Sequence, residues 1–352
     1  MRIGIPKEIK TLEGRVGLIP AAAAELVQHG HEVYVESGAG VASGYPDAAY
    51  TQAGVKILPD ARTLYGEAQM IVKVKEPVEG ELDLLRADHL LFSFLHLAAN
   101  PGLTRRLREI GLVAVAFETV QEASGHLPLL APMSDIAGRL ATQIGCHLLH
   151  RPLGGKGILL GGVSGADRGR VVILGAGTAG SGAARLAAGL GAEVVVFDRD
   201  RDRLETIRTI GPNVTGLFSY AEQLAAAVAS ADLLIGAVLV TGARAPHLVT
   251  ADMVRAMSPG SVVIDISVDQ GGCIETTRPT TYADPTFLWE DIVHFGVTNM
   301  PGAVPRSASQ ALSAVLTPYV MALTRADWED HPELAAGINV KHGEVMHPAL
   351  KD

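Results

Sequence analysis

The chain has 352 residues, 48% of them hydrophobic and 19% charged, which is enough apolar material for the cores of two domains. Its net charge of −9 and its lack of a long basic run argue against nucleic acid or a membrane surface as a partner. The two cysteines, Cys146 and Cys273, lie far apart, which argues against a disulfide scaffold or a metal site and favours a reducing, cytoplasmic location.

Strand-like and helical segments alternate along the N-terminal third of the chain. Short apolar, β-branched runs predict strands at 2–6, 32–36, 70–74, 90–94 and 112–118. Helical spacing predicts helices over 21–30, ending at Gly30, and over 101–111. This alternation is typical of an α/β domain with a mainly parallel sheet.

A second set of α/β segments follows, with strands predicted at 170–175, 193–198, 231–239 and 261–267. Between the two sets, a long helix is expected over 133–152, with Ser134 as its N-cap and Asp135 in its first turn. A glycine-rich connector or hairpin is expected at 154–162. A final helix from about 308 to 324 would return the C-terminal segment to the first domain.

The segment "VVILGAGTAGSGAARLA" (171–187) carries the spacing G-x-G-x-x-G at Gly175, Gly177 and Gly180. A β-branched strand leads in, an alanine-rich helix leads out, and the next strand ends at Asp198, about 20 residues later, as in dinucleotide-binding units. The glycines would permit a tight turn, close approach of a pyrophosphate, and close packing of helix on sheet. Asp198 favours NAD because it would repel a 2′-phosphate, whereas Arg199 leaves NADP open. The alternative is a glycine-rich turn that binds nothing.

Four polar side chains lie at or just beyond the ends of predicted strands: Arg15, Lys75, His96 and Asp269. The carboxyl ends of parallel strands are where sites gather in α/β proteins. A guanidinium can clamp a carboxylate, an ammonium can polarise a carbonyl, and an imidazole can exchange protons near neutral pH. An acid can orient that imidazole or hold a water. Each residue alone also has a structural interpretation, such as a surface arginine, a solvated strand end or a core histidine with satisfied ring nitrogens.

The sequence resembles the alanine dehydrogenase family nearly from end to end. The segments that carry the resemblance are "GIPKEIKTLEGRVGL", "KVKEP", "FLHLA", "APMSDIAGRLA", "LGAGTAG", "DLLIGAVLV", "DISVDQGGC", "RPTTY" and "NMPGAVP". The related transhydrogenase α subunits and saccharopine-type dehydrogenases share the architecture but match fewer of these segments together.

This resemblance implies roles for the four polar residues. Arg15 would bind the carboxylate of alanine or pyruvate, and Lys75 would lie at the carbonyl or amino group. His96 would be the general acid/base, with Asp269 as its catalytic companion.

The resemblance also implies a set of residues around the cofactor NAD. They are Ser134, Gly175, Gly177, Thr178, Ala179, Gly180, Asp198, Arg203, Ser219, Val238, Leu239, Ile266, Ser267, Val268, Asp269, Arg278, Val297, Thr298, Asn299 and Met300.

Two segments depart from the family's usual pattern. "GGVSGADRG" stands where the family more often has a proline-containing "GVPG" turn, and "TNMP" stands where "ANMP" is usual. The first segment belongs to a hairpin that serves oligomer contacts in the family, so the departure bears on assembly rather than on chemistry.

The expected protein is α/β, with two Rossmann-like domains of mainly parallel sheets linked by long helices. Residues 1–128 with 307–352 would form the substrate domain, and 129–306 the NAD-binding domain. Polar residues interrupt the apolar stretches 224–240 and 307–323, so no membrane span is expected. The resemblance implies a cytoplasmic homohexamer that converts L-alanine, water and NAD to pyruvate, ammonia and NADH, and back. A transhydrogenase-like NAD-binding subunit and a non-catalytic NAD-sensing module are the alternatives.

Overall fold

The computed structural model describes residues 1–238 and 246–351 and divides into two compact units. Unit 1 comprises Met1–Met133 and Gly302–Asp352, and unit 2 comprises Ser134–Pro301. The boundaries expected from the sequence, 128/129 and 306/307, each lie five residues from these divisions. Among the described residues, no helix is both long and apolar enough to cross a bilayer.

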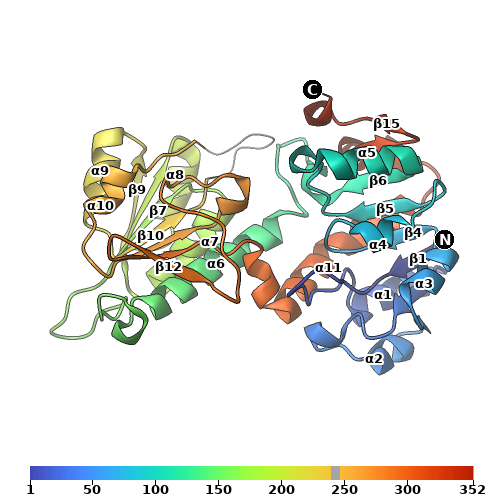
Figure 1. Ribbon diagram of the computed structural model, residues 1–352, viewed down its shortest axis with the longest axis horizontal. Coiled ribbons are helices and arrows are strands. Elements are labelled where there is room, and N and C mark those ends of the chain that lie inside the picture. The colour runs from blue at the N-terminus through green and yellow to red at the C-terminus, as the bar shows by residue number, and fades with distance from the viewer. Residues whose placement is uncertain (239–245, 352) are drawn as a thin grey trace. The chain divides into compact units, whose positions relative to one another are not determined.

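Unit 1 is built on an eight-stranded sheet with the order β15-β14-β6-β5-β4-β1-β2-β3. Strands β1 to β6 pair in parallel, whereas β14 pairs antiparallel with β6, and β15 antiparallel with β14. The strands are β1 (Arg2–Ile5), β2 (Glu32–Glu36), β3 (Lys56–Leu58), β4 (Met70–Val72), β5 (Leu90–Ser93), β6 (Val113–Ala116), β14 (Ile338–Lys341) and β15 (Glu344–Val345). The C-terminal segment therefore completes the sheet begun by the N-terminal one (Figure 1).

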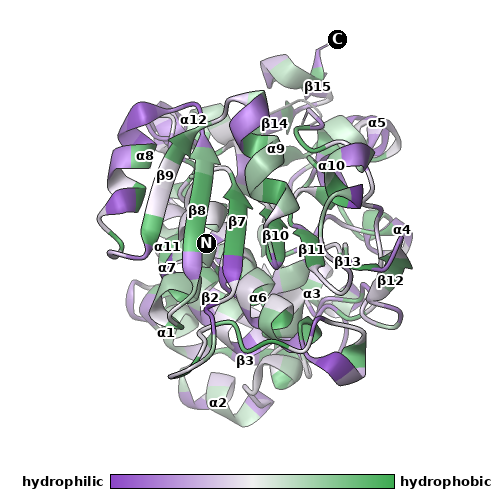
Figure 2. Cartoon of the chain, turned by 90° about the vertical axis from the view of Figure 1, so that its left-hand side faces the viewer, coloured by the Kyte–Doolittle hydropathy of each residue, from purple (hydrophilic) through white to green (hydrophobic). Residues whose placement is uncertain are grey.

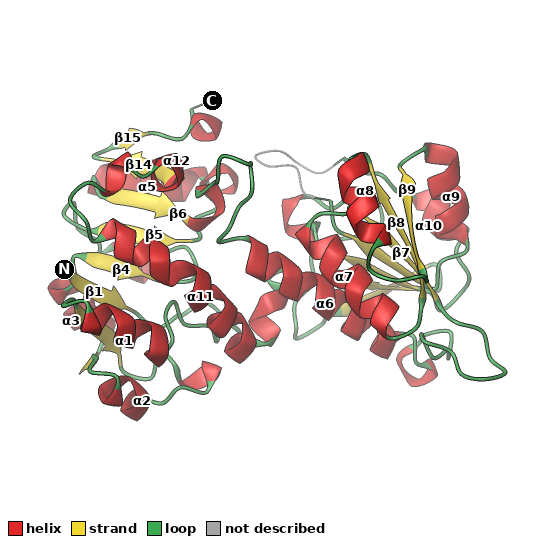
Figure 3. Cartoon of the chain, turned by 180° about the vertical axis from the view of Figure 1, so that it is seen from behind, coloured by secondary structure: helices red, strands yellow, loops and turns green. Residues whose placement is uncertain are grey.

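Helices cover the sheet of unit 1. They are α1 (Pro20–Gln28), α2 (Asp47–Gln52), α3 (Ala61–Glu67), α4 (Glu79–Leu82), α5 (Pro101–Ile110), α11 (Pro305–Leu323) and α12 (Pro332–Gly337). Figure 3 shows α1 and α11 lying side by side along the sheet. Helix α1 ends at Gln28 rather than at the expected Gly30, which instead has a positive φ of 83° in the following turn.

Unit 2 is built on a seven-stranded sheet with the order β12-β13-β11-β10-β7-β8-β9, parallel except for β12. The strands are β7 (Arg170–Leu174), β8 (Glu193–Asp198), β9 (Val214–Phe218), β10 (Leu233–Gly236), β11 (Val262–Asp265), β12 (Thr286–Trp289) and β13 (Ile292–Phe295). The helices are α6 (Ala131–Leu148), which begins in unit 1, α7 (Thr178–Gly189), α8 (Arg201–Arg208), α9 (Ala221–Ala229) and α10 (Ala251–Arg255). Figure 2 shows the central strands coloured as strongly apolar, as expected for a parallel sheet that is covered on both faces.

The start of α6 corrects two expectations. The helix begins at Ala131, so Ser134 lies inside it rather than at its N-cap, and Asp135 is beyond the first turn. Pro132 can occupy the second helical position because the first turn does not use its missing N–H. Asp135 instead forms an i,i+4 ion pair with Arg139, with 3.0 Å between Oδ2 and Nε.

Candidate substrate and nucleotide sites

The sheet order of unit 1 brings three of the predicted site residues to the same end of the sheet, where the carboxyl ends of its parallel strands lie. Strands β5, β4 and β1 are neighbours and run in parallel, so their carboxyl ends lie next to one another. His96 follows β5, Lys75 follows β4, and Arg15 lies in the loop that follows β1. Asp269, the fourth residue, belongs to unit 2 and is described with that unit below.

Arg15 is held as part of a buried ion pair with Glu13. The Arg15 side chain is 3% exposed and that of Glu13 is 0% exposed, so the pair is shielded from solvent. Glu13 Oε1 accepts hydrogen bonds from the Arg15 backbone N–H at 3.0 Å and from Nε at 2.7 Å, and Oε2 accepts from Nη2. Nη1 lies 3.3 Å from the sulfur of Met133, a weak acceptor. The fork is therefore fixed in direction, as a carboxylate clamp requires.

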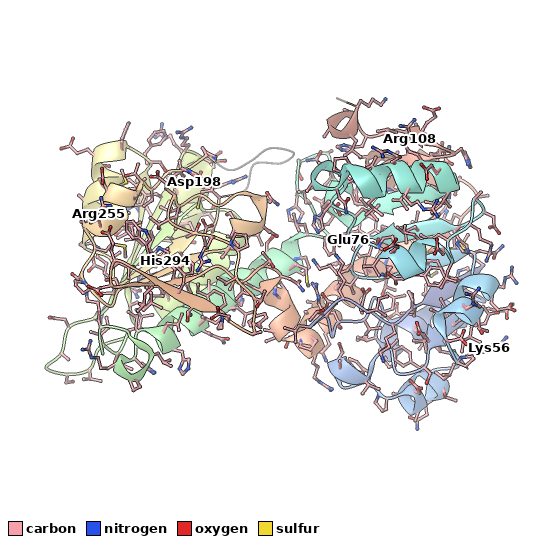
Figure 4. The ribbon with its side chains drawn as sticks, in the orientation of Figure 1. Lys56, Glu76, Arg108, Asp198, Arg255 and His294 are labelled. Atoms are coloured by element: carbon pink, nitrogen blue, oxygen red, sulfur yellow. The ribbon has the colours of Figure 1, made fainter. Side chains whose placement is uncertain are left out.

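Lys75 is half-buried and lies among charged groups. Burial lowers the pKa of its ammonium, and the nearby Arg15 guanidinium lowers it further, whereas Glu76 and Glu13 act in the opposite direction. Glu76 itself pairs with Lys10 and is labelled in Figure 4. A lysine with a lowered pKa is closer to exchanging a proton at neutral pH than an exposed one.

His96 occupies a left-handed backbone conformation, with φ 49° and ψ 40°. Such a conformation is uncommon outside glycine and needs support from its surroundings. Glu118 supplies that support, because Oε1 accepts the His96 N–H at 2.6 Å and the carboxylate also accepts the Leu95 N–H at 3.2 Å. The ring stacks on Phe94, with centroids 5.9 Å apart and planes within 5°. The apolar run therefore fixes a half-buried imidazole at the end of its strand.

In unit 2, the glycine motif forms the turn between β7 and α7. Gly175 has φ 96°, and a Cβ on it would meet the Ala237 carbonyl oxygen at 2.6 Å. A Cβ on Gly180 would lie 1.8 Å from the carbonyl oxygen of Gly175, so only glycine lets the helix pack this close to the strand. Gly177 precedes the twelve-residue helix α7, and the first backbone N–H groups of this helix point towards the turn. These features fit the pyrophosphate of a dinucleotide.

Asp198 ends β8 next to this turn (Figure 4). Its carboxylate accepts hydrogen bonds from the Ala176 N–H at 2.6 Å and from the Arg199 and Asp200 N–H groups at 2.7 and 2.9 Å. Arg203 is exposed on α8, and its Nη1 lies 3.8 Å from the position of a Cβ on Gly177. An acid and a base therefore flank the glycine turn.

The segment that carries Asp269 is organised by another carboxylate. Asp265, at the end of β11, is 1% exposed, and burial raises its pKa against the effect of its hydrogen bonds. The hydrogen bonds that it accepts measure 2.8–3.1 Å and come from the Ser267, Cys273 and Ile274 N–H groups and from the Thr277 hydroxyl. The short helical turn Val268–Gln270 lies within this segment and presents Asp269 to solvent.

The other described residues that were predicted to surround the cofactor also lie in unit 2. Leu239 lies outside the described residues. Ser219 donates its N–H to the Asp198 carbonyl at 3.1 Å, and Ser267 Oγ donates to the Val238 carbonyl at 2.7 Å. Arg278 lies over the ring of Phe287 at 4.4 Å. The remaining members are Ser134, Thr178 and Ala179 on the helices and Ile266, Val268, Val297, Thr298, Asn299 and Met300 beyond β11 and β13.

Sequence reasoning missed four acids: Glu8, Glu13, Glu118 and Asp265. Each accepts backbone N–H groups from a segment that carries a predicted site residue. The available signal was an acid within or beside an apolar stretch, as in "AFET" and "VVIDIS". As for metals, the described residues contain no group of three His, Cys, Asp or Glu side chains placed to hold an ion.

Two mainly parallel α/β units, one with a dinucleotide-type glycine turn and the other with cationic and imidazole groups at neighbouring strand ends, define the class of Rossmann-like dehydrogenases. Comparison with known proteins makes the assignment specific. Residues 4–137 match the N-terminal domain of the alanine dehydrogenase/PNT family, and 141–348 match its C-terminal domain. The chain belongs to this family.

Individual relatives agree in length and fold. A solved structure of an L-alanine dehydrogenase has a TM-score of 0.96 and 49% identity, covering 100% of this chain and 98% of that one. The alanine dehydrogenases of Halomonas elongata and Bacillus subtilis are 48% and 47% identical, over 100% and 99% of this chain and 96% and 94% of their own. A transhydrogenase from Sinorhizobium meliloti has a TM-score of 0.86 at 26% identity, covering 99% of this chain and 100% of that one. The expected family and α/β fold class are confirmed.

Proposed function

We propose that this chain catalyses the reversible, NAD-dependent oxidative deamination of L-alanine to pyruvate and ammonia. The observation that carries the proposal is the edge of unit 1 where Arg15, Lys75 and His96 follow neighbouring strands. Its support is the full-length similarity to proteins named alanine dehydrogenase. A transhydrogenase-like subunit would act on two nucleotides and would have no need of a clamp for a small carboxylate.

The substrate would be held by its charges. The Arg15 fork, already fixed by Glu13, would receive the carboxylate of alanine or pyruvate at Nη1, which lies 3.3 Å from the sulfur of Met133. Lys75 would bind the amino or carbonyl group at C2, and its lowered pKa would limit repulsion of the alanine ammonium. Both groups reduce the freedom of a small substrate, which is a main source of rate acceleration.

Proton transfer would fall to His96, with Asp269 as its companion. NAD, when bound, supplies the hydride acceptor. The ammonium of alanine would first lose a proton to solvent, so that hydride loss from C2 leaves an iminium. His96 would take a proton from the water oxygen that attacks C2 and return it to the nitrogen. Ammonia would then leave as His96 takes the remaining hydroxyl proton and passes it to solvent, and pyruvate remains. Glu118 keeps the His96 backbone in the conformation that aims the ring.

The residues proposed to hold NAD are those of unit 2 described above. The turn that Gly175 and Gly180 allow would receive the pyrophosphate at Gly177 and the first N–H groups of α7, and Asp198 would accept hydrogen bonds from the adenosine ribose. Asp269 with the Ile266–Val268 segment, Arg278 and residues 297–300 would border the nicotinamide. The Asp198 carboxylate would repel a 2′-phosphate, which favours NAD over NADP.

A panel of amino acids tests the function directly. L-Alanine is expected to reduce NAD rapidly, whereas glycine and the acidic amino acids should reduce it little or not at all. With L-alanine as substrate, turnover with NADP should be at least about tenfold slower than with NAD. Reduction is followed by absorbance at 340 nm, and pyruvate is identified as the product. An enzyme that binds NADH but reduces NAD with no amino acid would instead be a sensing module, and the proposal would be wrong.

We further propose a cytoplasmic homohexamer. Both cysteines are free thiols, with Cys146 half-buried and Cys273 buried, which fits a reducing compartment. Leu159 of the glycine-rich connector and Val163 directly after it are exposed apolar side chains that a subunit contact would cover. Analytical ultracentrifugation is expected to give about six times the chain mass of 36.8 kDa, whereas a monomer would contradict the assembly.

A further inference from the structure

Glu8 is a buried acid that lies behind Lys75 in unit 1. It follows β1 in the loop, is 7% exposed, and directs its carboxylate at the segment after β4. Oε1 accepts the backbone N–H of Val74 at 2.6 Å and that of Lys75 at 3.3 Å. Glu8 thus touches the main chain that carries the Lys75 side chain, and it has no direct part in the proposed chemistry.

The other oxygen of Glu8 faces a cluster of buried charged groups in which two carboxylates, Glu8 and Glu81, lie near a single ammonium, that of Lys73. Lys73 is 1% exposed, and its Nζ donates to both oxygens of Glu81 at 2.6 and 2.7 Å. The Tyr65 hydroxyl also donates to Glu81, at 3.3 Å. Glu8 Oε2 lies 3.7 Å from the same Lys73 Nζ and, among the described residues, has no hydrogen-bond partner. Two buried carboxylates therefore lie near one ammonium, and the Lys73 ammonium donates its hydrogen bonds to Glu81 rather than to Glu8.

An ionised Glu8 is consequently expensive to bury but useful as an anchor. A buried negative charge without full compensation destabilises a fold. The same charge strengthens the hydrogen bonds that Oε1 accepts from the main chain, because charged acceptors bind N–H groups more tightly than neutral ones. The ionised carboxylate therefore lowers the stability of the fold, but it holds the backbone at Lys75 more firmly.

We propose that Glu8 is a proton-dependent positioning residue, whose ionised carboxylate fixes the backbone at Lys75 for substrate binding and whose protonation loosens it. This inference rests on the proposed function, because it assigns Lys75 to the substrate. It adds a residue outside the reacting groups that makes activity depend on pH.

The groups around Glu8 set where it titrates. Burial raises its pKa from the ordinary 4.5 to about 7, Lys73 and the Val74 N–H act to lower it, and Glu81 and Glu13 act to raise it. The Tyr65 hydroxyl also faces this cluster. The folded protein thus binds more protons than the unfolded chain between pH 4.5 and 7. The contribution of Glu8 to stability is largest below pH 4.5 and is lost as pH rises through 7.

Activity and stability should therefore respond to Glu8 in opposite directions, which the substitution Glu8→Gln tests. Glutamine keeps an oxygen for the Val74 and Lys75 N–H groups but removes the charge. We expect kcat/KM for pyruvate to fall about tenfold at pH 8.5, mainly through KM, and the wild-type to variant ratio to approach one below pH 6. Glu8→Ala, which removes the acceptor as well, should lose about a hundredfold at pH 8.5. Groups common to both proteins cancel in the ratio.

Thermal unfolding gives a second readout that needs no turnover. We expect Glu8→Gln to have a higher Tm than wild type above pH 7, with the difference shrinking towards pH 5. Asp232→Asn is the matched control, because Asp232 also accepts a backbone N–H, that of Arg170, and pairs with Lys156. This purely structural acid in unit 2 should lower Tm on substitution and give a ratio of kcat/KM that does not vary with pH.

The outcomes separate this inference from the proposed function. Wild-type protein that is inactive with alanine and pyruvate overturns the proposed function, and the role of Glu8 in substrate binding with it. An active wild type whose ratio to Glu8→Gln stays flat from pH 6 to 8.5 overturns the inference about Glu8 alone. So does a Glu8→Gln variant that is less stable than wild type above pH 7, since the acid would then be an ordinary structural contact.

Discussion

Replacing His96 by alanine is expected to lower kcat for alanine oxidation by about 10²–10⁴-fold while changing the affinity for NADH by less than about twofold. The expected loss in kcat is that of a general acid/base, because the imidazole exchanges protons with the water and the nitrogen in the proposed reaction. Affinity for the nucleotide is expected to persist because the glycine turn and Asp198 lie in unit 2, whereas His96 lies in unit 1. Steady-state kinetics and NADH fluorescence titration measure the two quantities separately.

His29→Ala is the matched control for this substitution. His29 is an exposed histidine of the same unit, and its Nδ1 lies 2.8 Å from the Glu25 carbonyl oxygen at the end of α1. Its replacement should leave kcat within about twofold of wild type, as for most exposed positions. A His96→Ala enzyme that keeps full activity would show that the ring is a structural group stacked on Phe94, and would remove His96 from the mechanism.

The strands that sequence reasoning found are those whose burial is visible in their composition. β2 and β8 coincide with the predicted ranges, and the other strands that were predicted end one to three residues early. Six of the described strands were not predicted. Four of them, β3, β9, β12 and β15, lie at the sheet edges and are partly exposed, and a pattern of continuous apolar residues marks strands that are covered on both faces. The other two, β13 and β14, lie inside the sheets and are mostly buried, but each has only four residues.

The hairpin between β12 and β13 shows a second reason for a missed element. Its turn uses Glu290 and Asp291, with φ of 47° and 66°. Two consecutive positive φ values are the mark of a type I′ turn, for which Asn-Gly or Asp-Gly is the usual signal. Here the sequence Glu-Asp carries no such signal, and the turn is held by tertiary contacts, among them the Gly260 N–H donated to the Asp291 carbonyl at 2.8 Å.

The candidate site likewise contains some residues that could be predicted from the sequence and others that could not. Polar groups at strand ends could be predicted because strand ends are local features, and unit 1 brings Arg15, Lys75 and His96 to one sheet edge. The acids that hold them could not be predicted. Glu118 lies 22 residues from His96 and Glu8 lies 67 from Lys75, so these contacts exist only once parallel strands have paired. Positioning residues are defined by tertiary structure, whereas reacting groups also carry a chemical signature.

Replacing Arg15 by methionine is expected to damage two properties that a double substitution can separate. Loss of the guanidinium leaves the Glu13 carboxylate, whose side chain is fully buried, without its arginine, which should cost about 3–5 kcal/mol of unfolding free energy. Loss of the proposed clamp should weaken the binding free energy of pyruvate by about 2–5 kcal/mol. KM for pyruvate should therefore rise roughly 30-fold to several thousandfold. Denaturant unfolding and initial rates measure the two effects.

The double variant Arg15→Met with Glu13→Gln removes both charges of the buried pair. It should regain most of the lost stability, because a neutral amide in place of the carboxylate is far cheaper to bury. It should keep the raised KM, since no guanidinium remains for the substrate. Arg2→Met, which breaks an exposed ion pair with Glu67, serves as the control and should change stability by less than about 1 kcal/mol. A double variant that recovers both stability and KM would mean that Arg15 only neutralises Glu13, and the substrate carboxylate would need another partner.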